Sequence, residues 1–164
     1  MRSNGWLKEQ LDFLLKNYFS DVKISNPIEI RFGREAKYRF GSIRLIKSIR
    51  GIKSIKGTKS RFENLKFKIE NFSRTVPQKS VITITSLFAR ESIPVDVVRY
   101  TMAHELCHYA HGFSSQNRRM FKYPHHGGIV NRELKERGAG DLILKFKKWL
   151  KIYRKKILAG KTSV

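Results

Sequence analysis

The stretch Thr101-Met-Ala-His-Glu-Leu-Cys-His-Tyr-Ala110 contains the pattern H-E-x-x-H and decides both the fold and the chemistry expected of this chain. Residues four apart on an α-helix project from one face with Cβ atoms about 5–6 Å apart, so His104 and His108 can bind one metal ion. Zinc is the natural candidate, because it accepts neutral imidazole and a catalytic site usually keeps one position open beside three protein ligands. Glu105 lies about 100° further round the helix, where its carboxylate can act as a general base.

The residues on either side of this pattern favour a helix from about Pro94 to His111. Pro94 suits a first helical turn, Asp96 suits the positive N-terminal end of a helix, and Val97 begins an apolar face. Gly112 is typical of the residue that ends a helix. H-E-x-x-H also arises by chance, and a histidine on an apolar helix face is often only a hydrogen-bonded core residue, but the helical context favours a metal site.

Length and composition predict one domain over residues 1–164, because no linker rich in Pro, Gly or Ser divides the chain. The chain has no apolar run of membrane-spanning length, and charged residues interrupt the apolar stretch from Trp6 to Phe19. We therefore expect a soluble cytoplasmic protein that does not bind a membrane. The single cysteine, Cys107, cannot form an intramolecular disulfide and is expected to be a small buried group on the motif helix.

Basic residues greatly outnumber acidic ones, 35 Lys and Arg against 13 Asp and Glu, which gives a formal net charge of +22. Nucleic acid is the usual partner of such a chain, since each neutralised phosphate releases counterions and no sequence recognition is needed. We expect DNA to bind through this Lys and Arg surface. A membrane surface and a merely solvated basic face are the alternatives.

Apolar spacing predicts an α+β fold, in which a small, mostly antiparallel sheet supports the motif helix between N-terminal and C-terminal helices. The expected helices cover residues 5–19, 129–136 and 141–156 in addition to the motif helix. The expected strands are Ile28–Phe32, an extended segment from Ala36 through Gly41, and Val81–Thr85.

Residues 42–61 contain a triplet repeat in which every unit ends on a basic residue. A period of three suits neither a helix nor a strand, and in an extended form it would align the charges along one edge. We interpret this segment as a basic hairpin or arm that turns near Gly51 or Gly57 and can lie along a phosphate backbone. A solvated low-complexity loop is the alternative.

The third metal ligand must come from outside H-E-x-x-H, and the residues leave several candidates. The extended pattern H-E-x-x-H-x-x-G-x-x-H fails, because His111 replaces its glycine and Ser114 its third histidine. Glu133 is the nearest downstream carboxylate, although its neighbours do not form the usual N-E-x-x-x-D pattern. His126 is the downstream histidine alternative, whereas His111 is expected to flank the site or to face solvent.

Residues 38–130 resemble the SprT-like zinc metallopeptidases and the related YgjP-like metal hydrolases. The resemblance rests on Phe40-Gly41-Ser42, on Ile84 to His108, and on His126-Gly127-Gly128-Ile129-Val130, which is similar to the H-G-x-x-F segment of these families. It implies a zincin-like fold in which His104, His108 and His126 bind zinc and Glu105 is the catalytic base.

The chain departs from the pattern of these families at several points. Val130 replaces the usual aromatic residue and no Cys follows the Gly-Ser motif, which leaves His125 as the nearest rival of His126. The triplet segment is an insertion, and the C-terminal zinc ribbon of many SprT-like proteins is missing. DNA binding would therefore depend on surface charge.

The expected function is that of a zinc metallopeptidase, and the resemblance implies that its substrates are proteins on DNA. The substrate would lie as an extended strand beside a sheet edge. Tyr109 and Tyr123 are the candidates for stabilising the oxyanion. The alternatives are a non-catalytic nucleic-acid-binding protein with a structural zinc site and, less favoured, a metal-dependent nuclease.

Overall fold

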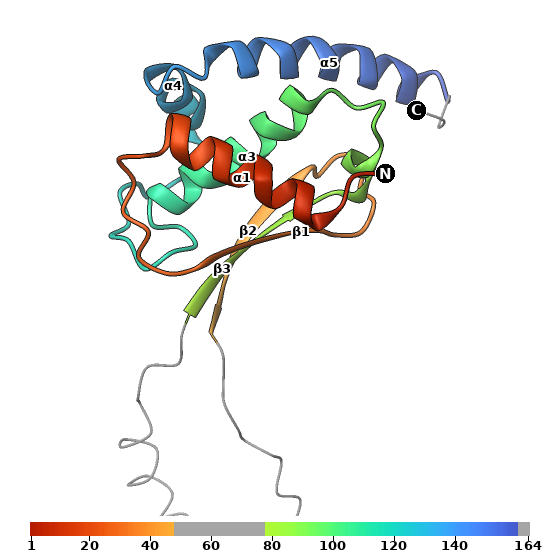
Figure 1. Ribbon diagram of the computed structural model, residues 1–164. Coiled ribbons are helices and arrows are strands. Elements are labelled where there is room, and N and C mark those ends of the chain that lie inside the picture. The colour runs from red at the N-terminus through yellow and green to blue at the C-terminus, as the bar shows by residue number, and fades with distance from the viewer. Residues whose placement is uncertain (48–77, 161–164) are drawn as a thin grey trace, which may run out of the picture.

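The computed structural model describes residues 1–47 and 78–160, which form a mixed α and β fold (Figure 1). The described helices are α1 (Asn4–Tyr18), α3 (Val95–Ala110), α4 (Ile129–Glu136) and α5 (Gly140–Leu158). The strands are β1 (Ile28–Phe32), β2 (Gly41–Lys47) and β3 (Gln78–Ile84). Short 3-10 helices, η1 (Ser86–Ala89) and η2 (His126–Gly128), precede α3 and α4. The predicted α+β class is confirmed.

The described sheet is mixed, which corrects the prediction of a mostly antiparallel sheet. Its strand order is β1-β3-β2, and β3 pairs in parallel with β1 and antiparallel with β2. Strands β1 and β2 follow each other along the chain but are separated in the sheet by β3. Apolar alternation predicts which residues are strands, but it carries no information on which strands pair.

Strand β2 begins where the predicted extended segment was expected to end. Residues 36–40 are irregular and held by Thr85, whose hydroxyl accepts from the Ala36 N–H at 2.9 Å and whose N–H donates to the Phe40 carbonyl at 2.9 Å. The first residues of the triplet repeat, Ser42–Lys47, form most of β2 despite their period of three. The rest of the expected arm, residues 48–61, lies outside the described residues.

Helix α3 is the centre of the molecule, between the sheet on one side and α5 on the other (Figure 1). Its sides are buried nearly all round, because α1, α4, α5 and the sheet contact it from different directions. Apolar side chains from all of these elements form one core: Leu7, Leu11, Leu14, Ile82, Ile84, Val97, Val98, Met102, Leu106, Leu134, Leu142, Ile143 and Tyr153.

The C-terminal end of α3 is fixed by a glycine. Gly112 has a φ of 76°, and a Cβ there would lie 2.6 Å from the backbone of Asn117 and Arg118. The next N–H, that of Phe113, donates to the His108 carbonyl at 3.0 Å, so the chain turns sharply after the last helical turn. The predicted helix from Pro94 to His111 is confirmed, since these two residues are its caps.

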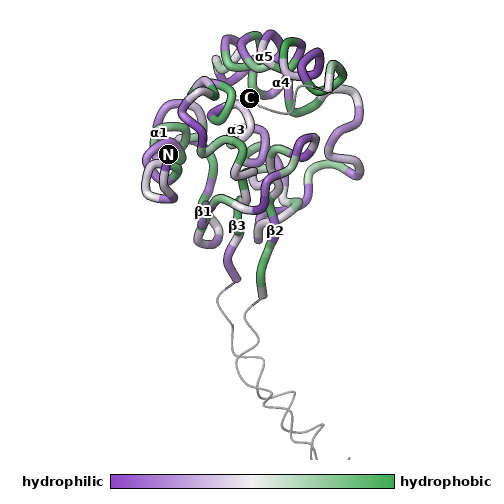
Figure 2. Tube along the Cα trace, turned by 90° about the vertical axis from the view of Figure 1, so that its right-hand side faces the viewer, coloured by the Kyte–Doolittle hydropathy of each residue, from purple (hydrophilic) through white to green (hydrophobic). Residues whose placement is uncertain are grey.

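Helix α5 covers the molecule on the side away from the sheet, and apolar and hydrophilic residues alternate along its path (Figure 2). Its inner aromatic residues pack on Phe40, whose ring lies 5.5 Å from Trp149 and 5.7 Å from Tyr153. Within the described residues, no helix has the length and apolar character needed to cross a bilayer.

Candidate metal centre

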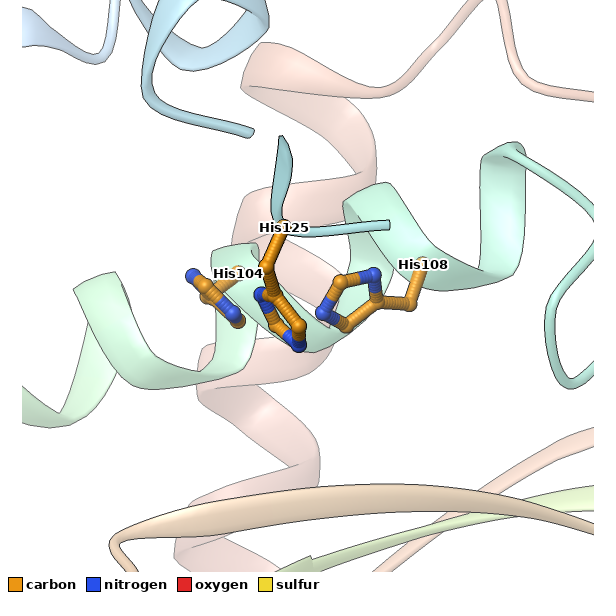
Figure 3. Close-up of side chains that lie close together, drawn as sticks. All are labelled: His104, His108 and His125. Atoms are coloured by element: carbon orange, nitrogen blue, oxygen red, sulfur yellow. The ribbon is translucent and has the colours of Figure 1, made fainter. Parts of the chain in front are cut away.

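Three histidine side chains from two segments converge above α3 (Figure 3). His104 and His108 extend from α3, and His125 reaches them from the segment before η2. One nitrogen from each ring can be chosen so that all three lie within 4.8 Å of one another. The ring centroids are 4.8 Å apart for His104 and His108, 5.4 Å for His104 and His125, and 4.7 Å for His108 and His125. This arrangement is suited to holding one metal ion.

The structure brings His125, not His126, to the pair on α3. His126 is exposed and lies outside the cluster. His125 is the N-cap of η2 and His126 is its first residue, so the two histidines differ in their place in the turn. Gly127 and Gly128 then take φ values of 64° and 68°, which turn the chain into α4.

Glu133 and His111, the other candidates for the third ligand, contact each other instead of the cluster. His111 is 3% exposed, and its Nε2 contacts Glu133 Oε2. The Arg137 Nε donates to Glu133 Oε1 at 2.8 Å, and its Nη1 donates to the Tyr18 carbonyl at 3.0 Å. His111 therefore does not face solvent; it is buried in a polar network that joins α3, α4 and the end of α1.

Burial keeps the two histidines of α3 neutral. Desolvation, with smaller contributions from the neighbouring His108 and His125, lowers the pKa of His104 to about 3. Desolvation also lowers the pKa of His108 to about 4, and the charge of Glu133 opposes this shift. Neutral imidazole is the form that binds a metal, so near neutral pH neither ring must first lose a proton.

Glu105 is 7% exposed and lies against the start of β2. Burial raises the pKa of its carboxyl to about 7, although the charge of Arg39 and a hydrogen bond from the Ile43 backbone act in the opposite direction. A Cβ on Gly41 would lie 2.9 Å from Glu105 Oε1 and 2.8 Å from Thr101 Cγ2. The carboxylate therefore fits only because residue 41 has no side chain.

A pocket of about 490 Å³ opens over these residues. His104, Glu105, His108 and His125 line it, together with the outer edge of β2 from Gly41 to Ile43. An aromatic wall, defined as Phe40, Tyr100 and Phe146, forms one side, and Arg39 lies at the rim. The pocket thus combines a potential metal site, a carboxyl group with a pKa near neutrality, a cation and an apolar surface.

The two tyrosines suggested for oxyanion stabilisation do not line this pocket. The Tyr109 hydroxyl is fully buried and bonds to the backbone of Asn26, donating to its carbonyl at 2.9 Å and accepting from its N–H at 3.1 Å. Tyr123 is 59% exposed. Cys107 is buried as expected, and desolvation raises the pKa of its thiol.

Sequence reasoning missed Arg39, the close approach of Gly41 to Glu105 and the aromatic wall. Arg39, Phe40 and Gly41 come from one segment and Phe146 from α5, and no spacing along the chain connects them to H-E-x-x-H. Tyr100 lies one helical turn before His104 on α3, so its spacing was a signal that the sequence offered. The adjacent histidines at 125 and 126 were a detectable signal for the third ligand, but it could not distinguish the two.

The three imidazoles fit zinc, since His₃ is a known donor set of catalytic zinc sites and the α3 pair is neutral near pH 7. Imidazole also binds copper, iron and nickel, so the three histidines alone do not select zinc over these transition metals. Comparisons of the chain with protein-family models, with curated proteins and with solved structures found no match.

Proposed function

We propose that this protein is a zinc-dependent metallopeptidase that hydrolyses peptide bonds in proteins bound to nucleic acid. The observation that carries the proposal is the convergence of His104, His108 and His125 beside the buried Glu105 in one open pocket. When bound, zinc would supply Lewis-acid polarisation of the scissile carbonyl and would lower the pKa of a water.

In this mechanism Glu105 accepts the proton of the attacking water and delivers it to the leaving amine. Its pKa of about 7 before metal binding supports the role, since burial has weakened the preference of the carboxyl for the ionised form. The Ile43 backbone and the space at Gly41 hold the carboxylate in place. We assign oxyanion stabilisation to Arg39, which lines the pocket and acts on Glu105 through its charge.

The pocket also supports a peptide substrate. It follows the outer edge of β2, which among the described strands pairs only with β3. An extended peptide in the pocket would lie beside this edge, with one side chain against the aromatic wall of Phe40, Tyr100 and Phe146. The net charge of +22 supports nucleic acid as the place where such substrates are found.

Glu105→Gln tests the catalytic part of the proposal. Zinc-loaded wild type is expected to cleave a DNA-bound basic protein, and the variant is expected to lose at least about a hundredfold in rate, the range of general-base catalysis. Zinc content, measured by mass spectrometry, should be equal in both. Equal rates in the two proteins would reject Glu105 as the base, and cleavage of plasmid DNA alone by wild type would favour a nuclease.

Single replacements of the two adjacent histidines test the ligand set. We expect His125→Ala to lose zinc and His126→Ala to retain it, because only His125 joins the pair on α3. Loss of zinc in the His126 variant alone would restore the ligand set implied by the resemblance.

A further inference from the structure

The outer surface of α5 has a dense basic face, defined here as Lys147, Lys148, Lys151, Arg154 and Lys155. All five side chains are exposed. At about 100° per residue they fall within an arc of about 120° on the helix, opposite the buried residues Leu142 and Tyr153. The basic face therefore points away from the core over residues 147–155, about half of the length of α5.

These cations are not neutralised by the part of the chain that the structure describes. The ion pair that α5 makes with α3 uses Lys145, whose Nζ lies 2.9 Å from Asp96 Oδ2. None of the five residues of the basic face has a carboxylate partner within the described ranges 1–47 and 78–160. Asp141, in the first turn, is the one acidic residue of the helix. A strongly positive potential should therefore extend along this face.

The opposite side of α5 holds the basic face rigidly. Phe146 stacks on Tyr100 with ring centroids 4.1 Å apart, and Trp149 lies 5.6 Å from Phe88. A partner of the basic face would therefore bind a surface that is already formed, and it would have to order only the lysine and arginine side chains.

The chemistry of this face favours nucleic acid over a lipid bilayer. A helix that lies in a membrane surface needs a continuous apolar face, and the apolar face of α5 is used in the core. Leu144 and Ile152 are exposed, at 70% and 51%, but they lie two turns apart among cations. The basic face runs for about 12 Å along the helix, a length over which each strand of a DNA duplex presents about three or four phosphates.

We propose that the basic face of α5 is the surface that binds the phosphate backbone of duplex nucleic acid, without sequence preference. Four of its five cations are lysines, which bind phosphates as point charges and do not match base edges in the bidentate manner of arginine. The biological role of this binding rests on the proposed function. The two are connected in the structure, since Phe146 of the same helix lines the pocket. Nucleic acid on α5 would then lie on the outer side of a helix that borders the pocket.

A charge-matched pair of variants tests the proposal by binding alone, so the result is independent of hydrolysis. One variant replaces Lys147, Lys148, Lys151 and Lys155 with Gln. The control replaces Lys8, Lys16, Lys23 and Lys37, which are exposed elsewhere, and loses the same charge. Binding to a fluorescent DNA duplex about two turns long is measured by anisotropy across a range of salt concentrations.

We expect the α5 variant to bind at least about tenfold more weakly, with a salt dependence shallower by about 0.9 for each phosphate that it no longer neutralises. The control should stay within about threefold of wild type, and two unrelated duplex sequences should bind equally. Equal weakening in both variants would overturn the proposal, since it would show that net charge alone matters. Binding of wild type to phosphatidylserine vesicles in preference to DNA, abolished only in the α5 variant, would also overturn it.

Lysine acetylation of the wild type gives a second test that does not depend on a folded variant. Bound duplex should protect Lys147, Lys148, Lys151 and Lys155 and leave Lys8 and Lys16 reactive. Protection confined to lysines outside α5 would reject the proposal.

Discussion

Glu105 is a residue whose environment opposes the charge that catalysis requires. The pKa of its carboxyl is about 7 in the folded chain, above the ordinary value of 4.5. Below pH 4.5 the group is protonated in the folded and unfolded states, and its burial carries no ionisation penalty. As the pH rises to 7 the unfolded state ionises first, so stability present at low pH is lost through this window.

This reasoning predicts how Glu105→Gln changes the stability of the metal-free protein. The free energy of unfolding of the variant should exceed that of wild type by about 2–3 kcal/mol more at pH 8 than at pH 4.5. Urea unfolding in the presence of a chelator measures the difference, and other titrating groups cancel between the two proteins. A difference that does not vary with pH would show that Glu105 is not buried as described.

Gly41 shows the importance of a missing side chain. We expect Gly41→Ala to push the Glu105 carboxylate away, because the new Cβ would lie 2.9 Å from its Oε1. Overpacking of this kind costs about 1–3 kcal/mol of stability. Peptidase activity should fall by at least about tenfold, the scale of losing part of general-base catalysis, while zinc content stays unchanged.

Gly140→Ala is the matched control, since the nearest atom to its Cβ would be Lys135 Cγ at 4.0 Å. This replacement should be neutral or stabilising by about 0.5 kcal/mol. Full activity of Gly41→Ala would show that the close approach to Glu105 does not matter for catalysis.

Residue types and local spacing predicted the part of the candidate site that one helix carries. They did not predict which residues from distant segments come to lie beside that helix. His104, Glu105 and His108 could be placed together because one helix carries them, and helix geometry is local. The choice between His125 and His126 depends on the backbone angles of the segment before η2, which spacing does not reveal. Arg39 and Gly41 lie more than sixty positions from the motif and could not be connected with it.

At the scale of elements, α3 and α4 must keep their relative positions for the three histidines to meet. Two of the polar contacts between them are the hydrogen bond that the Tyr100 hydroxyl donates to Asn131 Oδ1 at 2.9 Å and the contact of His111 with Glu133. Hydrogen bonds from His111 and Arg137 outweigh the desolvation of Glu133 and lower the pKa of its carboxyl. Glu133 is therefore charged near neutral pH, and it connects the end of α3 to Arg137 after α4.

Arg137→Met should weaken this connection between the helices. We expect a loss of about 2–3 kcal/mol in the free energy of unfolding, because Glu133 would keep its charge with one partner fewer. Lys79→Met, which breaks the exposed pair with Glu29, is the control and should cost less than about 1 kcal/mol. Equal losses in the two variants, measured by urea unfolding, would show that the buried network contributes no more than a surface ion pair.

The helices were predicted more accurately than the sheet. The expected helix over 129–136 matches α4, and the helix expected over 141–156 lies within α5, because apolar periodicity and glycine positions are local signals. The strand Ile28–Phe32 was also predicted with its observed bounds. Its parallel pairing with β3 was not, since it depends on how the whole chain is arranged.

At the scale of the whole molecule, metal binding should stabilise the folded chain. A ligand that binds only the folded state at a hundred times its dissociation constant adds about 2.7 kcal/mol, which for a domain of this size raises the thermal midpoint by about 5–10 °C. Zinc is expected to produce this rise in wild type and in His126→Ala, but not in His125→Ala. Magnesium, which prefers oxygen ligands, is the control and should have no effect. A zinc response that survives in His125→Ala would place the ion elsewhere.

The division of the histidines between a rigid helix and an exposed turn also has a kinetic consequence. His104 and His108 are fixed by α3, whereas His125 stands at the solvent boundary and is followed by two glycines with positive φ. Capture of an ion would then begin at the fixed pair and end when the turn closes over it. Release would follow the reverse order, so the lifetime of the metal-bound protein would depend on how often His125 moves away from the ion.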